Sequence, residues 1–242
     1  MKSRQLYNKV RRISFWTRLI DLIAPRSCPV CGNRLGISED LVCCQCLLTL
    51  PRTHYADDPY DNPMARLFWG RFNIEKAAAL FFYQTGSEKC HLIFSFKYDH
   101  RPDMARFIGR TMVMEMRDSG FFEGIDLLIP MPITPRRERE RGYNQSTMIA
   151  LGISEETGIP VADNVVRRTR FEKSQTHKTI LERMENVEAV FELVKPDAIR
   201  GRHLLVIDDV VTTGFTMYSC CRELSEVADC QISILSVAFA KN

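Results

Sequence analysis

The chain has 242 residues, of which 45% are hydrophobic and 26% are charged. This length and composition predict one well-filled α/β domain with a small appended module. The formal net charge of +3 is too small to identify a partner, and no apolar run reaches membrane-spanning length or forms a signal-peptide core. The sequence therefore excludes a membrane-spanning protein and predicts a cytoplasmic one.

Residues 1–24 are predicted to form a basic amphipathic helix that ends before Pro25. Apolar side chains recur at helical spacing among arginines and lysines, at Trp16, Leu19, Ile20 and Ile23. Such a helix could make a peripheral contact with an anionic membrane surface, or bind nucleic acid. The more common arrangement is that it docks on its neighbour in the same chain.

Residues 25–50 are predicted to form a zinc ribbon. Two Cys-x-x-Cys pairs arise when the second pair is taken as Cys43 and Cys46, and the ligands are then Cys28, Cys31, Cys43 and Cys46. Four thiolates leave no open coordination position, so the zinc would be structural. Cys44 could replace Cys43 as the third ligand and His54 is a distant substitute, but both are assigned non-ligand roles.

The remaining cysteines do not suggest a disulfide scaffold. The chain holds nine cysteines, an odd number, and several lie in apolar segments, including Cys90, Cys220, Cys221 and Cys230. Without an export signal, reduced thiols plus one metal site fit this pattern better than an oxidised protein.

Residues 51–75 are predicted to be a linker, because turn residues dominate from His54 to Pro63. Strands and helices then alternate from residue 76 to residue 242. Strands are expected at 77–83, 125–132, 164–168, 189–193, from 204 and at 231–239, with helices at 89–98, 104–116, 145–156 and 215–226. This alternation predicts an α/β domain with a doubly wound, mainly parallel sheet.

The strand that begins at Leu204 leads into the most informative motif. Its apolar residues do not alternate with polar ones, which is typical of a central parallel strand, and ligands collect at the carboxyl ends of such strands. Asp208 and Asp209 are expected where this strand stops, where they could accept hydrogen bonds from ribose hydroxyls or hold a hydrated divalent cation. After a turn at Val210 and Val211, we expect a phosphate-binding nest formed by Thr212, Thr213, Gly214, Phe215 and Thr216.

A basic segment follows the strand that ends at Pro132, so it should lie at the same edge of the sheet as Asp208. Its arginines are Arg136, Arg137, Arg139 and Arg141. Guanidinium groups bind phosphate oxygens bidentately, which makes these residues candidates for an anion or for DNA. The alternative is a solvated segment in which Glu138 and Glu140 pair with the arginines.

A second basic segment covers residues 167–178 and includes Phe171, Lys173 and Lys178. It is interpreted as a mobile loop that stacks on and screens a nucleotide strand, or folds over a bound pyrophosphate. An ordinary solvated loop is the alternative.

The segment from Val206 to Gly214 resembles the phosphoribosyl pyrophosphate (PRPP) loop of type I phosphoribosyltransferases. In that family the paired acids contact the ribose hydroxyls of PRPP, and the Thr-Thr-Gly-x-Thr turn binds its 5-phosphate. The resemblance assigns the acidic role to Asp208 and Asp209, the phosphate role to residues 212–216, and implies magnesium as the companion of PRPP.

The order of the motifs resembles the ComF family of competence proteins. It runs from the zinc ribbon through Arg-Gly-Tyr-Asn-Gln, Arg-x-x-x-x-x-x-Gln-Thr and Arg183-x-x-Asn186 to the PRPP loop, with a further match at Phe96-Lys97-Tyr98. The resemblance implies a phosphoribosyltransferase-like domain that handles incoming single-stranded DNA in bacterial transformation, with other competence or recombination proteins as partners. The alternative is an active phosphoribosyltransferase that transfers phosphoribosyl from PRPP to an unknown acceptor.

Overall fold

The computed structural model describes residues 25–83, 101–169 and 190–240. The predicted helices at 1–24 and 89–98 lie outside these ranges, as do Phe96-Lys97-Tyr98, Cys90, Lys173, Lys178, Arg183 and Asn186. No helix in the described ranges is long and apolar enough to cross a membrane.

A four-stranded sheet forms the centre of the domain, with strand order β1-β6-β5-β2. All three pairings are parallel. The strands are β1 (Ile74–Tyr83), β2 (Leu127–Pro130), β5 (His203–Val211) and β6 (Gln231–Ala240). The predicted α/β class with a mainly parallel sheet is confirmed.

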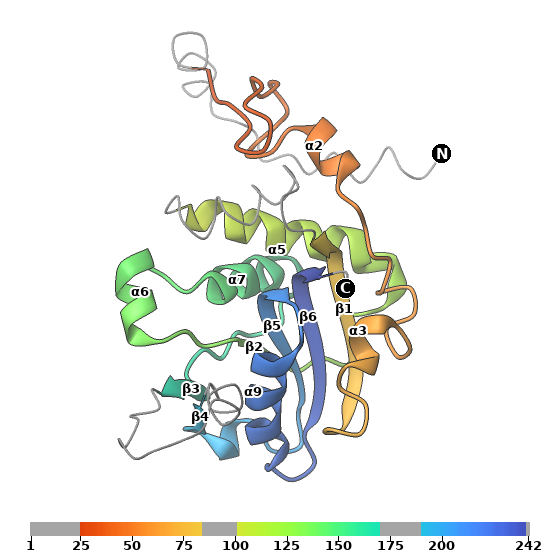
Figure 1. Ribbon diagram of the computed structural model, residues 1–242, viewed down its shortest axis with the longest axis vertical. Helices are drawn as coiled ribbons and strands as arrows, with labels where there is room; N and C mark the ends of the chain where they lie inside the picture. The colour runs from red at the N-terminus through yellow and green to blue at the C-terminus, as the bar shows by residue number, and fades with distance from the viewer. Residues whose placement is uncertain (1–24, 84–100, 170–189, 241–242) are drawn as a thin grey trace, which may run out of the picture.

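Helices cover both faces of this sheet (Figure 1). One face packs against α5 (Pro102–Met116) and α7 (Gln145–Thr157), and the other against α3 (Pro63–Arg66) and α9 (Phe215–Ser225). The apolar run of β5 contributes to both cores, since Leu205 and Ile207 face α5 and α7 while Leu204 and Val206 face α9. A strand buried on both sides needs apolar residues without alternation, as the sequence indicated.

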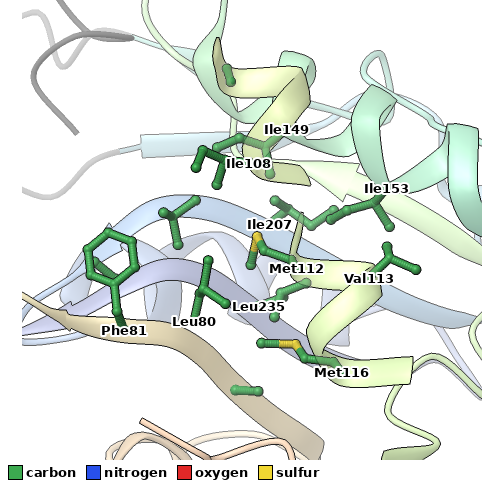
Figure 2. Packing of buried hydrophobic residues seen from close by; sticks show 14 of the residues in the cluster. Leu80, Phe81, Ile108, Met112, Val113, Met116, Ile149, Ile153, Ile207 and Leu235 are labelled. Carbon is green, nitrogen blue, oxygen red and sulfur yellow. The ribbon is translucent and has the colours of Figure 1, made fainter. Parts of the chain in front are cut away.

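The core under α5 and α7 also fixes the position of the candidate site. Figure 2 shows Ile108 and Met112 of α5 packed with Ile149 of α7 and Ile207 of β5. The two helices touch through their backbones, because a Cβ atom at Gly109 would lie only 2.2 Å from the carbonyl oxygen of Ile149. This close contact anchors α7, whose first turn reaches the carboxyl edge of the sheet.

Shorter elements surround this core. A separate antiparallel pair is formed by β3 (Val166–Thr169) and β4 (Val190–Leu193). The basic segment after β2 folds into α6 (Pro135–Arg141), which the sequence did not predict as a helix. The other short helices are α2 (Cys44–Thr49), η3 (Arg117–Ser119) and η4 (Pro196–Ala198).

Residues 51–75, predicted to be a linker, pack onto the sheet. The side chain of Asn62 accepts hydrogen bonds from the backbone of Met64 and Ala65 and so caps α3. Met64 and Phe68 are fully buried in the core shared with α9. The turn residues that suggested a linker serve instead to cap a short helix and to lead the chain into β1.

A buried histidine lies at the opposite, amino-terminal edge of the sheet. His203 begins β5, and its Nε2 atom lies 2.8 Å from Oγ of Ser233. Burial and the nearby charge of Lys76 lower the pKa of His203, whereas Glu75, Asp126 and a hydrogen bond with the Gly124 backbone act in the opposite direction. The imidazole is therefore held neutral in the folded protein.

We expect this histidine to make stability fall at acidic pH. Its ordinary pKa is 6.5 and the folded value is lower, so below pH 6.5 the unfolded chain takes up a proton that the folded chain resists. The free energy of unfolding should drop by up to about 1.4 kcal/mol per pH unit in that interval, with no effect above it. Urea unfolding at several pH values measures this, and His203→Gln should flatten the dependence.

The matched control is His54→Gln, because the His54 side chain is 74% exposed and its Nδ1 atom lies 3.7 Å from the equally exposed carboxylate of Asp57. A stability profile that is equally steep in His203→Gln and in the parent protein would contradict the assignment.

Candidate functional site

The paired acids lie within the last part of β5 rather than at its end. The sequence predicted that the strand stops at Asp208 and Asp209 and that Val210 and Val211 turn the chain. Instead, β5 continues to Val211, because β6 extends far enough to pair with both valines, at Ala238 and Phe239. The turn begins at Thr212, so this part of the prediction was wrong.

The carboxylate of Asp208 is held from two sides. Its Oδ1 atom accepts hydrogen bonds from Oγ of Ser146 at 3.1 Å and from the backbone N–H of Asp209 at 2.9 Å. Ser146 lies in the first turn of α7, where the side chain of Asn144 caps the helix and donates to the carbonyl of Met131 at 3.0 Å. The position of the acid is thus fixed by α7 and by the segment that follows β2.

The loop after β5 leads into an uncapped helix. Thr212 and Thr213 are exposed, and α9 begins at Phe215 without a side-chain hydrogen bond at its N-cap. The N–H groups of a first helical turn have no partner within the helix and favour an anion. Exposed hydroxyls and these N–H groups together can hold a phosphate.

Gly214 is required by both conformation and space. Its φ angle is 74°, in the left-handed region, and a Cβ atom there would lie 3.1 Å from two carbons of the Phe68 ring. Any other residue at this position would strain the loop and push it away from the segment that follows α3.

Arg168 is a site residue whose importance the sequence did not indicate, since it was considered only as part of a basic loop. It lies opposite Phe191 in the β3–β4 pair, and its Cζ atom lies 5.6 Å from the centre of that ring. Burial lowers the pKa of Arg168, as does the charge of Arg137, while Asp208 opposes the shift. The charges of Arg137 on α6 and of Asp208 on β5 therefore both act on Arg168.

The α6 arginines differ in their surroundings. Thr134 caps the helix, and Arg136 forms an ion pair with Glu140 at 2.7 Å. This pair agrees with the alternative in which glutamates of the segment neutralise its arginines. Arg137 and Arg139 are exposed and form no ion pair within the described parts of the chain. Arg141 is half-buried and has a polar partner. Arg137 and Arg139 are thus the α6 cations best placed for an external anion.

The segment that contains α2 lies at one end of the molecule (Figure 1), and four of its cysteines form a compact cluster. The sulfur atoms of Cys28, Cys31, Cys43 and Cys46 lie within 4.8 Å of one another, and those of Cys31 and Cys43 are 3.7 Å apart. Tetrahedral coordination with zinc–sulfur bonds of about 2.3 Å separates the sulfurs by about 3.8 Å. The cluster could therefore hold a metal ion such as zinc.

Backbone hydrogen bonds lower the pKa of one thiol in this cluster, and the neighbouring Cys44 lies outside it. Burial raises the pKa of the Cys28 thiol, but hydrogen bonds from the backbone of Cys43, Cys31 and Val30 outweigh burial and bring that pKa to about 7. Cys44 is exposed and lies outside the cluster. The structure thus selects Cys43 over the alternative that the sequence left open.

No protein-family model matches the chain, whereas several curated proteins are similar to it. It is 31% identical over 129 residues to the DNA utilization protein YhgH of Shigella flexneri, a match that covers 52% of this chain and 56% of that protein. It is 28% identical over 153 residues to the competence protein F of Haemophilus influenzae, covering 62% of this chain and 67% of that protein. The chain is thus similar to proteins named for DNA utilization and for competence.

The resemblance to ComF-family competence proteins that the order of motifs predicted is therefore confirmed. The match to the first of these relatives spans only about half of its length. Among solved structures, a glutamine PRPP amidotransferase from B. subtilis aligns with a TM-score of 0.37 and 18% identity, covering 56% of this chain and 26% of that chain.

Proposed function

We propose that this protein is a member of the ComF family that handles single-stranded DNA during natural transformation, and that residues 208–216 bind PRPP or a related phosphoribosyl ligand. The observation that carries the proposal is that both arginine and aspartate charges act on half-buried Arg168. The positive charge of Arg137 lowers the pKa of Arg168 and the negative charge of Asp208 opposes that shift, which supports a site that combines cationic and anionic groups. A sugar phosphate offers hydroxyl donors for the acids and anionic oxygens for the arginines.

In the proposed ligand site, the acids bind the ribose and the loop binds the phosphate. Asp208, oriented by Ser146, and Asp209 would accept hydrogen bonds from the ribose hydroxyls. The hydroxyls of Thr212, Thr213 and Thr216 and the first turn of α9 would hold the phosphate. Magnesium would accompany PRPP and neutralise part of its pyrophosphate charge.

The DNA contact is proposed to follow the exposed arginines of α6. Arg137 and Arg139 are not engaged in ion pairs within the described ranges, so they can neutralise backbone phosphates without breaking an existing contact. Lys173 and Lys178, which lie outside those ranges, are proposed to add to the same contact. Binding of this kind releases counterions and weakens as salt rises.

Titration of a fluorescent single-stranded oligonucleotide across salt concentrations tests this proposal. Affinity should fall steeply as the salt concentration rises. The double variant Arg137→Gln with Arg139→Gln should make the negative slope of log K against log salt shallower by about 1.4, or about 0.7 per lost phosphate contact. Fluorescence anisotropy measures both quantities.

The control removes two charges elsewhere, with Arg200→Gln and Arg222→Gln. These arginines already pair with Asp197 and Glu223, so the slope should stay near that of the parent protein. Absent binding, or binding insensitive to salt, would overturn the proposed DNA contact.

An active phosphoribosyltransferase is the second candidate, favoured by the fixed position of the Asp208 carboxylate. In that reaction a nucleophile attacks C1 of PRPP as pyrophosphate leaves, and nearby acids stabilise the positive charge that develops on the sugar. Release of pyrophosphate that depends on one base from a panel would place this reaction ahead of DNA handling.

A further inference from the structure

A group of aromatic and arginine side chains lies directly against the proposed phosphate loop. Phe68 packs on Gly214, and the centre of its ring lies 5.7 Å from that of Phe72. The Phe72 ring in turn lies 6.5 Å from the Tyr218 ring, and the planes of Phe72 and Tyr218 are inclined by only 25°. These contacts hold the segment after α3 on the first turns of α9.

The outward side chains of these two elements combine exposed rings with cations. Trp69 is 50% exposed, and Phe215, the first residue of α9, is 41% exposed. The Cζ atom of Arg66 lies 5.8 Å from the Trp69 ring, and that of Arg71 lies 5.4 Å from the Tyr218 ring. We call these five residues, Arg66, Trp69, Arg71, Phe215 and Tyr218, the aromatic–arginine surface.

The cations of this surface are not equivalent. Arg66 forms an ion pair with Asp61 at 2.7 Å, so its charge is already balanced. Arg71 is exposed and makes no ion pair within the parts of the chain that the structure describes. The surface therefore offers aromatic faces together with one uncompensated positive charge.

We propose that the aromatic–arginine surface stacks the unpaired bases of single-stranded DNA while Arg71 contacts a backbone phosphate. The proposal rests on the DNA-handling function above and gives it a base-contacting surface. Every base has a π-face, and exposed rings interleaved with cations bind single strands with little dependence on sequence. The bases of a duplex are already stacked on one another, so this surface should prefer single strands.

The position of the surface supports this occupant. Trp69 follows Phe68, whose ring touches Gly214, so stacked bases would lie next to the loop that is proposed to hold a sugar phosphate. Arg66 lies over the Trp69 ring and makes that ring a better stacking platform, since the cation fixes the indole and draws electron density toward one face. An apolar protein partner would gain from the rings but would leave the Arg71 charge without a partner.

Tryptophan fluorescence tests the proposal, because the chain contains only two tryptophans, Trp16 and Trp69. In a Trp16→Phe background, emission reports on Trp69 alone. Titration with short oligothymidylate at low salt should quench this emission. Trp69→Ala should weaken binding measured by anisotropy about tenfold, Trp69→Phe should retain most of it, and Arg71→Gln should reduce the salt slope by about 0.7.

The matched control is Met114→Ala, which removes an exposed apolar side chain from α5 on the other face of the sheet. It should leave oligonucleotide affinity unchanged. If the parent protein binds oligothymidylate but Trp69 emission and Trp69→Ala affinity stay unchanged, the stacking surface is overturned while DNA handling stands. Equal quenching by a duplex of the same length would also overturn it, and a parent protein that binds no oligonucleotide would remove both proposals.

Discussion

Replacing Asp208 and Asp209 together by asparagine is expected to abolish measurable binding of magnesium-PRPP. Asparagine keeps the size of each side chain but loses the negative charge that makes a carboxylate a strong acceptor of hydrogen bonds from ribose hydroxyl groups. Each hydrogen bond to a charged group contributes about 1.5–3 kcal/mol, so the loss of two corresponds to a hundredfold or greater drop in affinity, on the order of 10² to 10⁴. Isothermal titration calorimetry measures it.

The chain supplies its own control in a second pair of adjacent aspartates. Asp57 and Asp58 are both exposed and precede α3, so Asp57→Asn with Asp58→Asn changes the same number of charges without touching the loop. Ser146→Ala offers a graded test, because it removes one hydrogen bond to Asp208 and should cost about 1 kcal/mol of binding. Unchanged PRPP affinity in the Asp208 and Asp209 double variant would remove the site assignment.

The centre of this site could be predicted because its signals are local in the sequence. The apolar run of β5 and the acids that follow it required only that a parallel strand be buried on both faces. The end of the strand was not predictable in the same way. How far β5 extends depends on whether β6, a separate segment, offers Ala238 and Phe239 as partners for Val210 and Val211.

Two other differences have the same physical origin. The sequence of α6 alternates arginine and glutamate without an apolar periodicity, and its helix depends on the Thr134 cap and on the Arg136–Glu140 pair. Residues 51–75 looked like a linker because turn residues dominate from His54 to Pro63, whereas the buried Met64 and Phe68 lie in a short stretch after them. Short elements with few apolar residues gain their stability from capping and tertiary contacts, which periodicity does not reveal.

Arg168 shows what sequence reasoning misses at a site assembled from distant segments. The effect of Arg137 and Asp208 on its pKa depends on where the β3–β4 pair holds it, and these two strands are separated in the sequence by residues 170–189. The cysteines are the opposite case. Two Cys-x-x-Cys pairs a few residues apart bring their thiols together through local turns, so their spacing alone predicted the cluster.

Cys43→Ser is expected to remove the bound metal and to unfold the segment 25–50. We propose that the metal is zinc, held by the four clustered thiols. Structural zinc contributes about 10–16 kcal/mol of apparent folding free energy in small peptides, far more than the few buried apolar residues of this segment can supply. Elemental analysis should find about one zinc per chain in the parent protein and a strong loss in the variant. Trypsin should then cut after Arg34, which lies between the two cysteine pairs.

Cys44→Ser is the matched control, because it removes an adjacent, exposed thiol while the backbone N–H of residue 44 can still donate to Glu39. Its zinc content and trypsin resistance should equal those of the parent protein. Loss of zinc in Cys44→Ser with retention in Cys43→Ser would reverse the ligand assignment, and no zinc in the parent would end the proposal of a zinc ribbon. The core shared with α9 contains no residue of the segment 25–50, and most of the core beside α5 and α7 also comes from the α/β domain, so in Cys43→Ser the four-stranded sheet and its helices should stay folded. PRPP binding that survives in this variant would separate the structural role of the metal from the chemistry of the loop.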